Sequence, residues 1–451
     1  MQKVIFFFAI LFFLPVYTSG QKQRLLVTTD IGGDPDDQQS LVRLMVYANE
    51  FDIEGIISSA AGTPGELGRE IVRPELIVEI IHAYEKVYPN LIKHDKNYAS
   101  PSDLIEVVKT GNPYRGWNYV GEGHDTEGSE WIIKMADRQD DRLLNISVFG
   151  GQTDLAQALW NVKNNRTPEE YKRFISRIRI YDINDQDKIF DLLIADHPDL
   201  WYILAKAPEG HDKREGAYRG IYLGGNEDLT SMEWMRSNVL ENHGPLGELY
   251  PRKTWTAPNP HGVMKEGDTP SWFYFLNNGL NVPEHPEFGG WGGRFQKNDK
   301  GYFSDAIDSF GNEAIARAGV YRWREDFQND FAARMDWCVG EYAACNHPPA
   351  VVINGIEGRE NLTLDFRVGD NVTLDAAGSS DPDKNELSYE WMVYKEAGNF
   401  SETIEIKFSG TMATFLMPQL EPDSSIHIIL KVSDKGMPGL SAYRRIILRN
   451  C

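Results

Sequence analysis

Four aspartates lie within eight residues near the start of the chain, in the stretch TTDIGGDPDD. They are Asp30, Asp34, Asp36 and Asp37. Carboxylates this close together repel one another unless a positive charge binds between them, and their oxygens suit hard cations such as Ca²⁺ or Mg²⁺. The spacing therefore favours a metal site. The alternative is an acidic turn without a metal, because aspartate and glycine are common in loops.

The segments on either side of this cluster predict how it is positioned. Leu25–Val27 is an apolar run typical of a buried strand, and residues 41–48 carry apolar side chains at helical spacing. Pro35 suits the first position of that helix, and Asp34 suits the capping position before it. The next two aspartates then lie in the first helical turn, where the helix dipole favours negative charge. Asp30 ends the strand, at the sheet edge where α/β proteins bind ligands.

Further buried runs alternate with helical patterns along the chain. Ile53–Ala60, Leu143–Gly151 and Arg177–Asn184 are predicted strands, and Gly220–Gly225 is predicted to be a shorter one. This alternation predicts an α/β fold with an open, mostly parallel sheet and right-handed crossovers. Phe303–Cys338 has a helical pattern and is expected to close this domain.

Other candidate site residues follow from their positions. Asn184 and Asp185 lie at the carboxyl end of a predicted strand, where they are candidates for binding hydroxyl groups. His124 lies among acidic residues in a long loop, either as a substrate contact or as a solvated residue. Trp291 belongs to an aromatic, glycine-rich segment that indicates either a sugar-stacking wall or core packing. Asp268 precedes the aromatic helix predicted in the same segment.

Composition limits the choice of partner and compartment. A net charge of −21 argues against a nucleic acid or an anionic membrane as a partner. Residues 1–20 have the pattern of a signal peptide, with Lys3, an apolar run and small residues before Gln21. No later stretch is long enough to span a membrane. No cysteine comes directly after the predicted cleavage site, so a lipid anchor of the bacterial type is not expected. We therefore expect a secreted or periplasmic protein, in which Cys338 and Cys345 are close enough in sequence for a disulfide.

The composition changes at residue 346. A proline-marked linker, NHPPAVVING, is followed by short alternating strands separated by turn residues. This pattern predicts a small all-β sandwich of immunoglobulin-like type. We expect three parts: a signal peptide at 1–20, an α/β domain at 21–345 and a β-sandwich domain at 346–451.

Several motifs resemble those of a known family. TTDIGGDPDD resembles the D-x-D-P-G-x-D-D motif of nucleoside hydrolases, and FGGQTDLA at 149–156 resembles their G-P-L-T-N-L-A segment. The longer stretches DIGGDPDDQQSLVRL, EGHDTEGSE, EGDTPSW and EHPEFGGWGGR are similar to the cellulose-binding, nucleoside hydrolase-like family of secreted proteins. That family joins such a domain to a C-terminal sandwich of immunoglobulin-like or polycystic-kidney-disease-like type.

The resemblance implies a Ca²⁺ site and a hydrolytic reaction. The implied ligands are four oxygen donors: the carboxylates of Asp30, Asp37 and Asp268 and the backbone carbonyl of Phe149. Asp36 matches the general base that takes the proton of the attacking water. Asp34 is a rival for this role, because it is an extra carboxylate in a turn two residues longer than the family's.

Three departures from the family bear on the substrate. Thr28 replaces the first aspartate of the family motif. Gly267 replaces the histidine that precedes the aspartate matched by Asp268, and Thr63 replaces an asparagine that contacts the sugar. The missing histidine removes a candidate acid for a nucleobase leaving group, which favours a furanoside or another glycan end group over free nucleosides.

We therefore predict a secreted, Ca²⁺-dependent hydrolase of N- or O-glycosidic bonds that acts on a carbohydrate or nucleoside. The alternative is a non-catalytic polysaccharide-binding protein whose acidic cluster holds a structural Ca²⁺. Because related enzymes often form dimers or tetramers, a homo-oligomer is one expected state.

Overall fold

The computed structural model describes residues 21–61, 71–254, 263–400, 402, 404–421 and 424–450. The predicted signal peptide and Thr63 lie outside these ranges. Within them, no helix combines the length and the apolar character that crossing a membrane requires.

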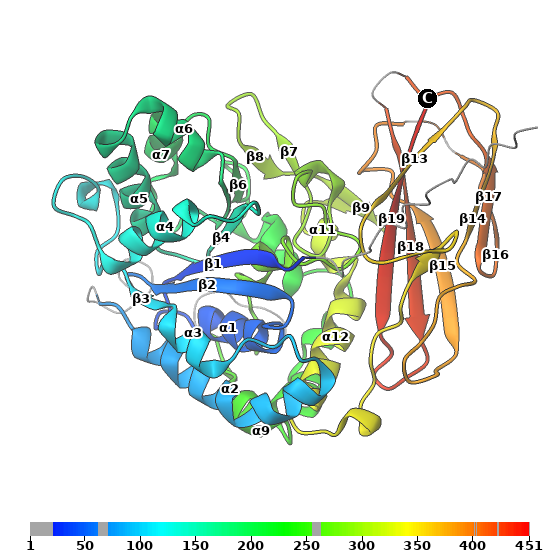
Figure 1. The fold of residues 1–451 in the computed structure, drawn as a ribbon, viewed down its shortest axis with the longest axis horizontal. Helices are drawn as coiled ribbons and strands as arrows, with labels where there is room; N and C mark the ends of the chain where they lie inside the picture. The colour runs from blue at the N-terminus through cyan, green and yellow to red at the C-terminus, as the bar shows by residue number, and fades with distance from the viewer. Residues whose placement is uncertain are drawn as a thin grey trace, which may run out of the picture.

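An eight-stranded sheet forms the centre of the larger part of the molecule (Figure 1). Its order is β3-β2-β1-β4-β5-β6-β8-β7, and all pairings are parallel except that of β7 with β8. The strands are β1 (Gln23–Thr29), β2 (Phe51–Ser58), β3 (Val108–Thr110), β4 (Leu144–Val148), β5 (Ile178–Ile183), β6 (Tyr202–Ala205), β7 (Phe295–Lys297) and β8 (Phe303–Asp305). The predicted α/β fold with an open, mostly parallel sheet is confirmed.

The order of the strands reverses in the middle of this sheet. β1 pairs with β2 on one side and with β4 on the other, so that Thr28 lies opposite both Ile57 and Val148. The chain moves outward from β1 to β3, then returns to β4 and moves outward again to β6. Open α/β sheets bind ligands where the order reverses, at the carboxyl ends of the strands. The loops after β1 and β4 meet at this point.

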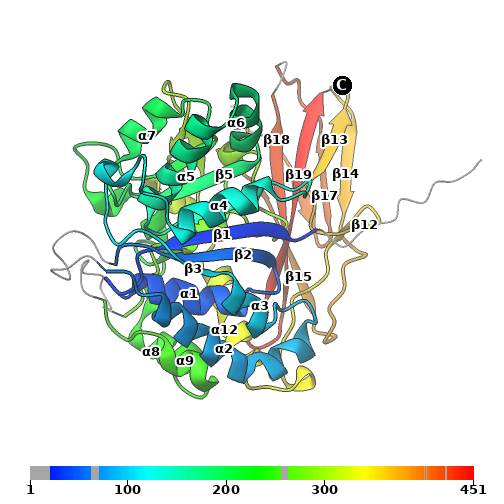
Figure 2. The ribbon, with the colours of Figure 1, turned by 60° about the vertical axis from the view of Figure 1, so that its left-hand side comes forward.

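Helices cover both faces of the sheet (Figures 1 and 2). Because successive side chains of a strand point to opposite faces, Leu25 and Val27 of β1 belong to one core and Leu26 to the other. The first core receives side chains from α1 (Asp36–Val46), α2 (Pro74–His94), α3 (Pro101–Glu106), α8 (Met232–Met235), α9 (Gly244–Leu249), α10 (Thr269–Phe273), α11 (Ala318–Tyr321) and α12 (Arg324–Trp337). The second receives them from α4 (Glu127–Asp137), α5 (Gln152–Asn165), α6 (Pro168–Ile175) and α7 (Phe190–Asp196).

Three local expectations are wrong. Gly220–Gly225 is not a strand, because the chain turns into a 3₁₀ helix (η3) at Ala217–Ile221, and β6 is the next strand of the sheet instead. The stretch 303–338 is not helical throughout: it begins with β8 and a hairpin of β9 (Asp308–Phe310) and β10 (Glu313–Ile315) before α11 and α12. Cys338 and Cys345 are free thiols rather than a disulfide.

The C-terminal part consists of two β-sheets, as predicted (Figure 1). One has the order β13-β19-β18-β15 and the other β14-β17-β16, and buried side chains of both form a separate core. The strands are β13 (Leu362–Phe366), β14 (Asn371–Asp375), β15 (Leu387–Val393), β16 (Lys407–Ser409), β17 (Met412–Leu416), β18 (Ile426–Asp434) and β19 (Ser441–Asn450). A short hairpin of β11 (Val352–Ile353) and β12 (Ile356–Glu357) precedes them. The sequence did not indicate β17.

The two parts share a buried polar interface. Asp308, at the start of β9, accepts hydrogen bonds from Arg294 (2.5 Å) and from the Tyr394 hydroxyl (2.5 Å), and it pairs with Arg322 at 3.3 Å. Arg445 of β19 donates to backbone carbonyls of the larger part, including that of Leu280 at 2.9 Å. The boundary expected between residues 345 and 346 stays a prediction.

Replacing Asp308 tests this interface. Asp308→Asn removes the carboxylate partner of the largely buried Arg294 and the nearer of the two partners of Arg322, so we expect a loss of about 3–5 kcal/mol in the free energy of unfolding. Urea unfolding followed by circular dichroism measures it. Glu386→Gln is the matched control, because Glu386 pairs with Lys435 in solvent with its side chain 74% exposed, and we expect a change of about 0–1 kcal/mol there. If Asp308→Asn and Glu386→Gln changed the free energy of unfolding equally, the contacts of Asp308 would not stabilise the interface.

Candidate active site

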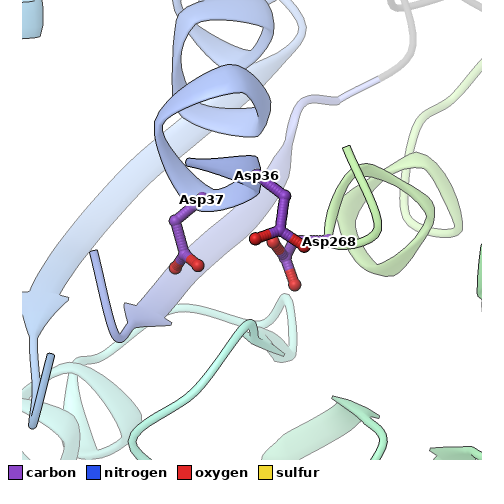
Figure 3. Close-up of side chains that lie close together, drawn as sticks. All are labelled: Asp36, Asp37 and Asp268. Atoms are coloured by element: carbon purple, nitrogen blue, oxygen red, sulfur yellow. The ribbon is translucent and has the colours of Figure 1, made fainter. Parts of the chain in front are cut away.

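Three carboxylates converge beyond the carboxyl end of β1 (Figure 3). Asp36 and Asp37 begin helix α1, and Asp268 directly precedes helix α10. One oxygen from each of the three lies within 4.8 Å of the others. Asp37 and Asp268 are buried, whereas the side chain of Asp36 is 15% exposed. The structure thus brings Asp36 and Asp37 of the first motif close to Asp268, which follows Asp37 by 231 positions in the sequence.

Helix α1 holds the segment that carries Asp268. The side-chain amide of Gln39 accepts the backbone N–H of Lys265 at 2.9 Å and donates to the Val263 carbonyl at 2.6 Å. One helical turn later, Arg43 forms a fully buried ion pair with Glu266 at 2.5 Å. Because these two side chains bind both ends of the segment 263–266, they fix Asp268 relative to the first turn of α1.

The cluster carries an excess of negative charge in a buried place. Burial raises the pKa of Asp37 well above its usual range, and the neighbouring carboxylates of Asp30 and Asp268 raise it further. Burial also raises the pKa of Asp268 well above its usual range, with Asp36 the next cause. Oδ2 of Asp268, a residue only 1% exposed, has no hydrogen-bond partner within the described ranges. A buried carboxylate oxygen without a donor, beside two other carboxylates, fits a divalent cation with oxygen ligands.

Lys265 lies on one flank of the cluster. Its ammonium group pairs with Asp34 and lies 3.1 Å from Oδ2 of Asp36. Burial opposes its charge, but the two aspartates raise the pKa of Lys265 above its usual value. Burial raises the pKa of Asp36 to about 6, and Lys265 limits this rise. Helix α1 begins at Asp36 without a side-chain cap, so the expectation that Asp34 caps this helix is wrong: its carboxylate pairs with Lys265 instead.

Arg115 pairs with Asp30 and was not singled out from the sequence. Its guanidinium donates to Oδ2 of Asp30 at 2.6 Å and to the Ala60 carbonyl at 2.6 Å, and it lies 3.7 Å from Asp187. Burial raises the pKa of Asp30, and Arg115 counters this rise. The only sequence signal was an arginine inside the aromatic loop NPYRGWNY. Asp30, an implied metal ligand, is therefore bound to an arginine in this structure.

The loop after β4 reaches the same place. The backbone carbonyl of Phe149, the fourth implied ligand, accepts a hydrogen bond from the Gln186 side chain. The hydroxyl of Thr28 donates to the Gly150 carbonyl at 2.6 Å. A Cβ atom at Gly150 would lie 2.5 Å from Cγ of Asp30, so a residue without a side chain is required there. The loop after β4 thus lies against Asp30 at the reversal point, through the residue that follows Phe149.

Two of the expected substrate contacts already have structural partners. Asp185 accepts the backbone N–H groups of Ile189 and Phe190 at 3.0 Å and pairs with Lys206 at 3.1 Å, so its carboxylate stabilises the start of α7. Asn184, next to it, is half-buried with a positive φ of 69°, and its backbone N–H donates to Ala205 at the end of β6.

Two further expected substrate contacts, Trp291 and His124, pack against aromatic side chains. Trp291 is only 3% exposed and packs against Phe273 and Tyr443, so of the two roles that the sequence left open the structure shows core packing, beside the C-terminal part. His124 is half-buried and packs edge-on against Tyr119 with ring centroids 6.2 Å apart. Thr63 lies outside the described residues.

Comparisons with known proteins agree with this fold. Residues 24–295 match the family described as cellulose-binding Sde182, nucleoside hydrolase-like domain, and residues 371–450 match the C-terminal domain of the cellulose-binding protein Sde0182. No curated protein gives a significant match.

One solved structure is similar over nearly the full length. It is a nucleoside hydrolase-related hypothetical protein from Saccharophagus degradans, described as associated with carbohydrate metabolism. It is 33% identical, with a TM-score of 0.79 over 96% of this chain and 100% of its own. A protocadherin γB2 fragment with cadherin domains 3–6 matches 23% of this chain at 18% identity, covers 25% of its own chain and has a TM-score of 0.18, which carries no argument.

The raised pKa values predict how stability depends on pH in the absence of divalent cations. A carboxyl whose pKa is higher in the folded state stabilises the fold below its unfolded pKa, and this contribution is lost as the pH rises. The cluster should therefore favour folding at pH 5 over pH 8. Asp305 titrates in the same pH range, because burial raises its pKa to about 7. The wild type is therefore compared with Asp268→Asn, which keeps Asp305 and removes one carboxylate of the cluster.

We expect the melting temperature of the wild type to fall between pH 5 and pH 8 by about 3 °C more than that of Asp268→Asn. Thermal unfolding in EDTA measures this difference. Identical pH profiles for the two proteins would contradict the electrostatic description of the cluster.

Proposed function

The chain belongs to the cellulose-binding, nucleoside hydrolase-like family, and on that premise we propose that it is a Ca²⁺-dependent hydrolase of N- or O-glycosidic bonds. Its substrate is a ribosyl, furanosyl or other glycan end group. The observation that supports this proposal most is the buried cluster of Asp36, Asp37 and Asp268, with an oxygen of Asp268 that lacks a donor among the described residues.

Asp37 and Asp268 are the residues that would hold Ca²⁺, with the Phe149 carbonyl and Asp30 beside them. Asp37 and Asp268 are buried beside one another, and neither residue forms an ion pair with a described basic side chain. When bound, Ca²⁺ supplies a fixed positive charge that orients sugar hydroxyls and acidifies a coordinated water.

Asp36 has the properties of the general base. Its carboxylate is the more accessible one of the cluster, and burial raises its pKa to about 6, which suits a group that accepts a proton near neutral pH. Lys265, 3.1 Å away, keeps it oriented. A water would form the new bond to the anomeric carbon and transfer its proton to Asp36, while the glycosidic bond breaks through an oxocarbenium-like transition state. The leaving group departs with the bonding electrons and takes up a proton from solvent. Asp34 is the less suitable base, because its carboxylate is more deeply buried and makes the closer of the two contacts with Lys265.

The proposal also includes association with a glycan and a location outside the cytoplasm. The family description and the Saccharophagus degradans protein both point to carbohydrate. The signal-peptide pattern of residues 1–20 supports a secreted or periplasmic location, where polymeric glycans are accessible. The C-terminal sandwich contacts the larger part through Tyr394, whose hydroxyl donates to Asp308. This contact is independent of which part binds glycan.

Asp36→Asn is the direct test of the base. The variant keeps the size of the side chain but accepts no proton, so we expect sugar release to fall about 10²- to 10⁴-fold while binding of the glycan persists. Release from nucleosides, aryl furanosides and cell-wall glycans is measured with Ca²⁺ and with a chelator. Asp34→Asn is the matched control, and we expect less than about a tenfold loss from it.

The same panel separates the two functional classes. If wild-type protein releases no sugar from any substrate but still binds Ca²⁺ and retains cellulose, the chain is a non-catalytic polysaccharide-binding protein. If Asp34→Asn loses more activity than Asp36→Asn, the two aspartates exchange roles.

A further inference from the structure

Arg115 places a positive charge on a carboxylate that the family resemblance assigns to the metal. Its guanidinium is 2.6 Å from Oδ2 of Asp30, and the side chain of Arg115 is only 8% exposed. A guanidinium this close shields one oxygen of Asp30 from any other cation. Because Asp30 lies beside Asp37, a cation in the cluster and Arg115 compete for the same carboxylate.

The loop that carries Arg115 is fixed at several points to helix α5. The backbone N–H of Asn112 donates to Asp154 at 2.9 Å, and that of Gly116 donates to the Thr153 hydroxyl at 2.9 Å. The residues on both sides of Arg115 are therefore anchored, and only its side chain is left to change position.

A second carboxylate is ready to receive the same guanidinium. Nη1 of Arg115 lies 3.7 Å from Oδ1 of Asp187, and neither atom has a hydrogen-bond partner among the described residues. The other oxygen of Asp187 accepts the backbone N–H (2.7 Å) and the hydroxyl of Thr153, which hold it in place. A movement of about 1 Å would turn the Arg115–Asp187 ion pair into a direct hydrogen bond.

We propose that Arg115 is a built-in counter-ion of Asp30 that a divalent cation must displace, and that Asp187 is the alternative partner of the displaced guanidinium. This inference rests on the cation site of the proposed function. In the cation-free state, Arg115 neutralises Asp30. In the cation-bound state, Asp30 turns to the cation while Arg115 remains paired with Asp187, so no buried charge is left alone.

The proposal predicts that Arg115 lowers the affinity for Ca²⁺. A cation binds only those molecules in which Asp30 is released from Arg115. The apparent dissociation constant for the cation therefore rises as the fraction of such molecules falls. Arg115→Met removes the competing charge and keeps an unbranched apolar stem. We expect Ca²⁺ alone, titrated into the full chain by isothermal calorimetry, to bind this variant about tenfold more tightly than the wild type.

A double-mutant cycle with Asp30→Asn separates direct competition from a general effect of charge. If Arg115 acts through Asp30, Arg115→Met changes the affinity less than about twofold in the Asp30→Asn background. Asp187→Asn should weaken Ca²⁺ binding in the wild type, and this effect should disappear in the Arg115→Met background, because Asp187 acts through the guanidinium.

Three results would overturn the proposal. The first is a wild type that binds Ca²⁺ with the same affinity as Arg115→Met, or more tightly. The second is an equal gain from Arg115→Met with and without Asp30→Asn, which would make Arg115 a remote charge. The third is no Ca²⁺ binding by either protein, which would also refute the cation site of the proposed function. Binding without sugar release would refute only the hydrolase and leave this inference standing.

Discussion

The site depends on the buried contact between helix α1 and the segment that leads into α10. Arg43 and Glu266 form an ion pair with no exposed area, and Gln39, one turn earlier on α1, binds the backbone on both sides of Met264. A buried pair of this kind adds little net stability but fixes geometry, since breaking it leaves an unpaired charge. Through it, the first turn of α1 and the segment before α10, which are far apart in sequence, present their aspartates to one another.

The arrangement of charge follows from this contact. Lys265 pairs with Asp34 and Asp36, and Arg115 pairs with Asp30 and Asp187. Asp37 and Asp268 form no ion pair with a described basic side chain, and burial and neighbouring carboxylates raise their pKa values. Protons relieve this repulsion at low pH, and a divalent cation would relieve it at neutral pH.

Sequence patterns predicted the sheet, its helical layers and the edge at which the aspartates meet, because hydrophobic periodicity and strand–turn–helix order are local. They failed where a side chain's partner lies far along the chain. The sequence left Trp291 between a sugar-stacking wall and core packing, and only the structure shows that Phe273 and Tyr443 bury it. Arg115 and Lys265 have no local signature, and the pairing of Asp34 with Lys265 replaces the helix cap that Asp34-Pro35 suggested.

The central claim is that the aspartate cluster binds a divalent cation, and a crystal structure grown with Ca²⁺ tests it most directly. Anomalous scattering locates the ion without assumptions about the reaction. We expect one site between Asp37 and Asp268, with oxygen ligands at about 2.3–2.6 Å and Arg115 turned from Asp30 toward Asp187. A cluster without an anomalous peak at saturating Ca²⁺, with Arg115 still on Asp30, would contradict the account.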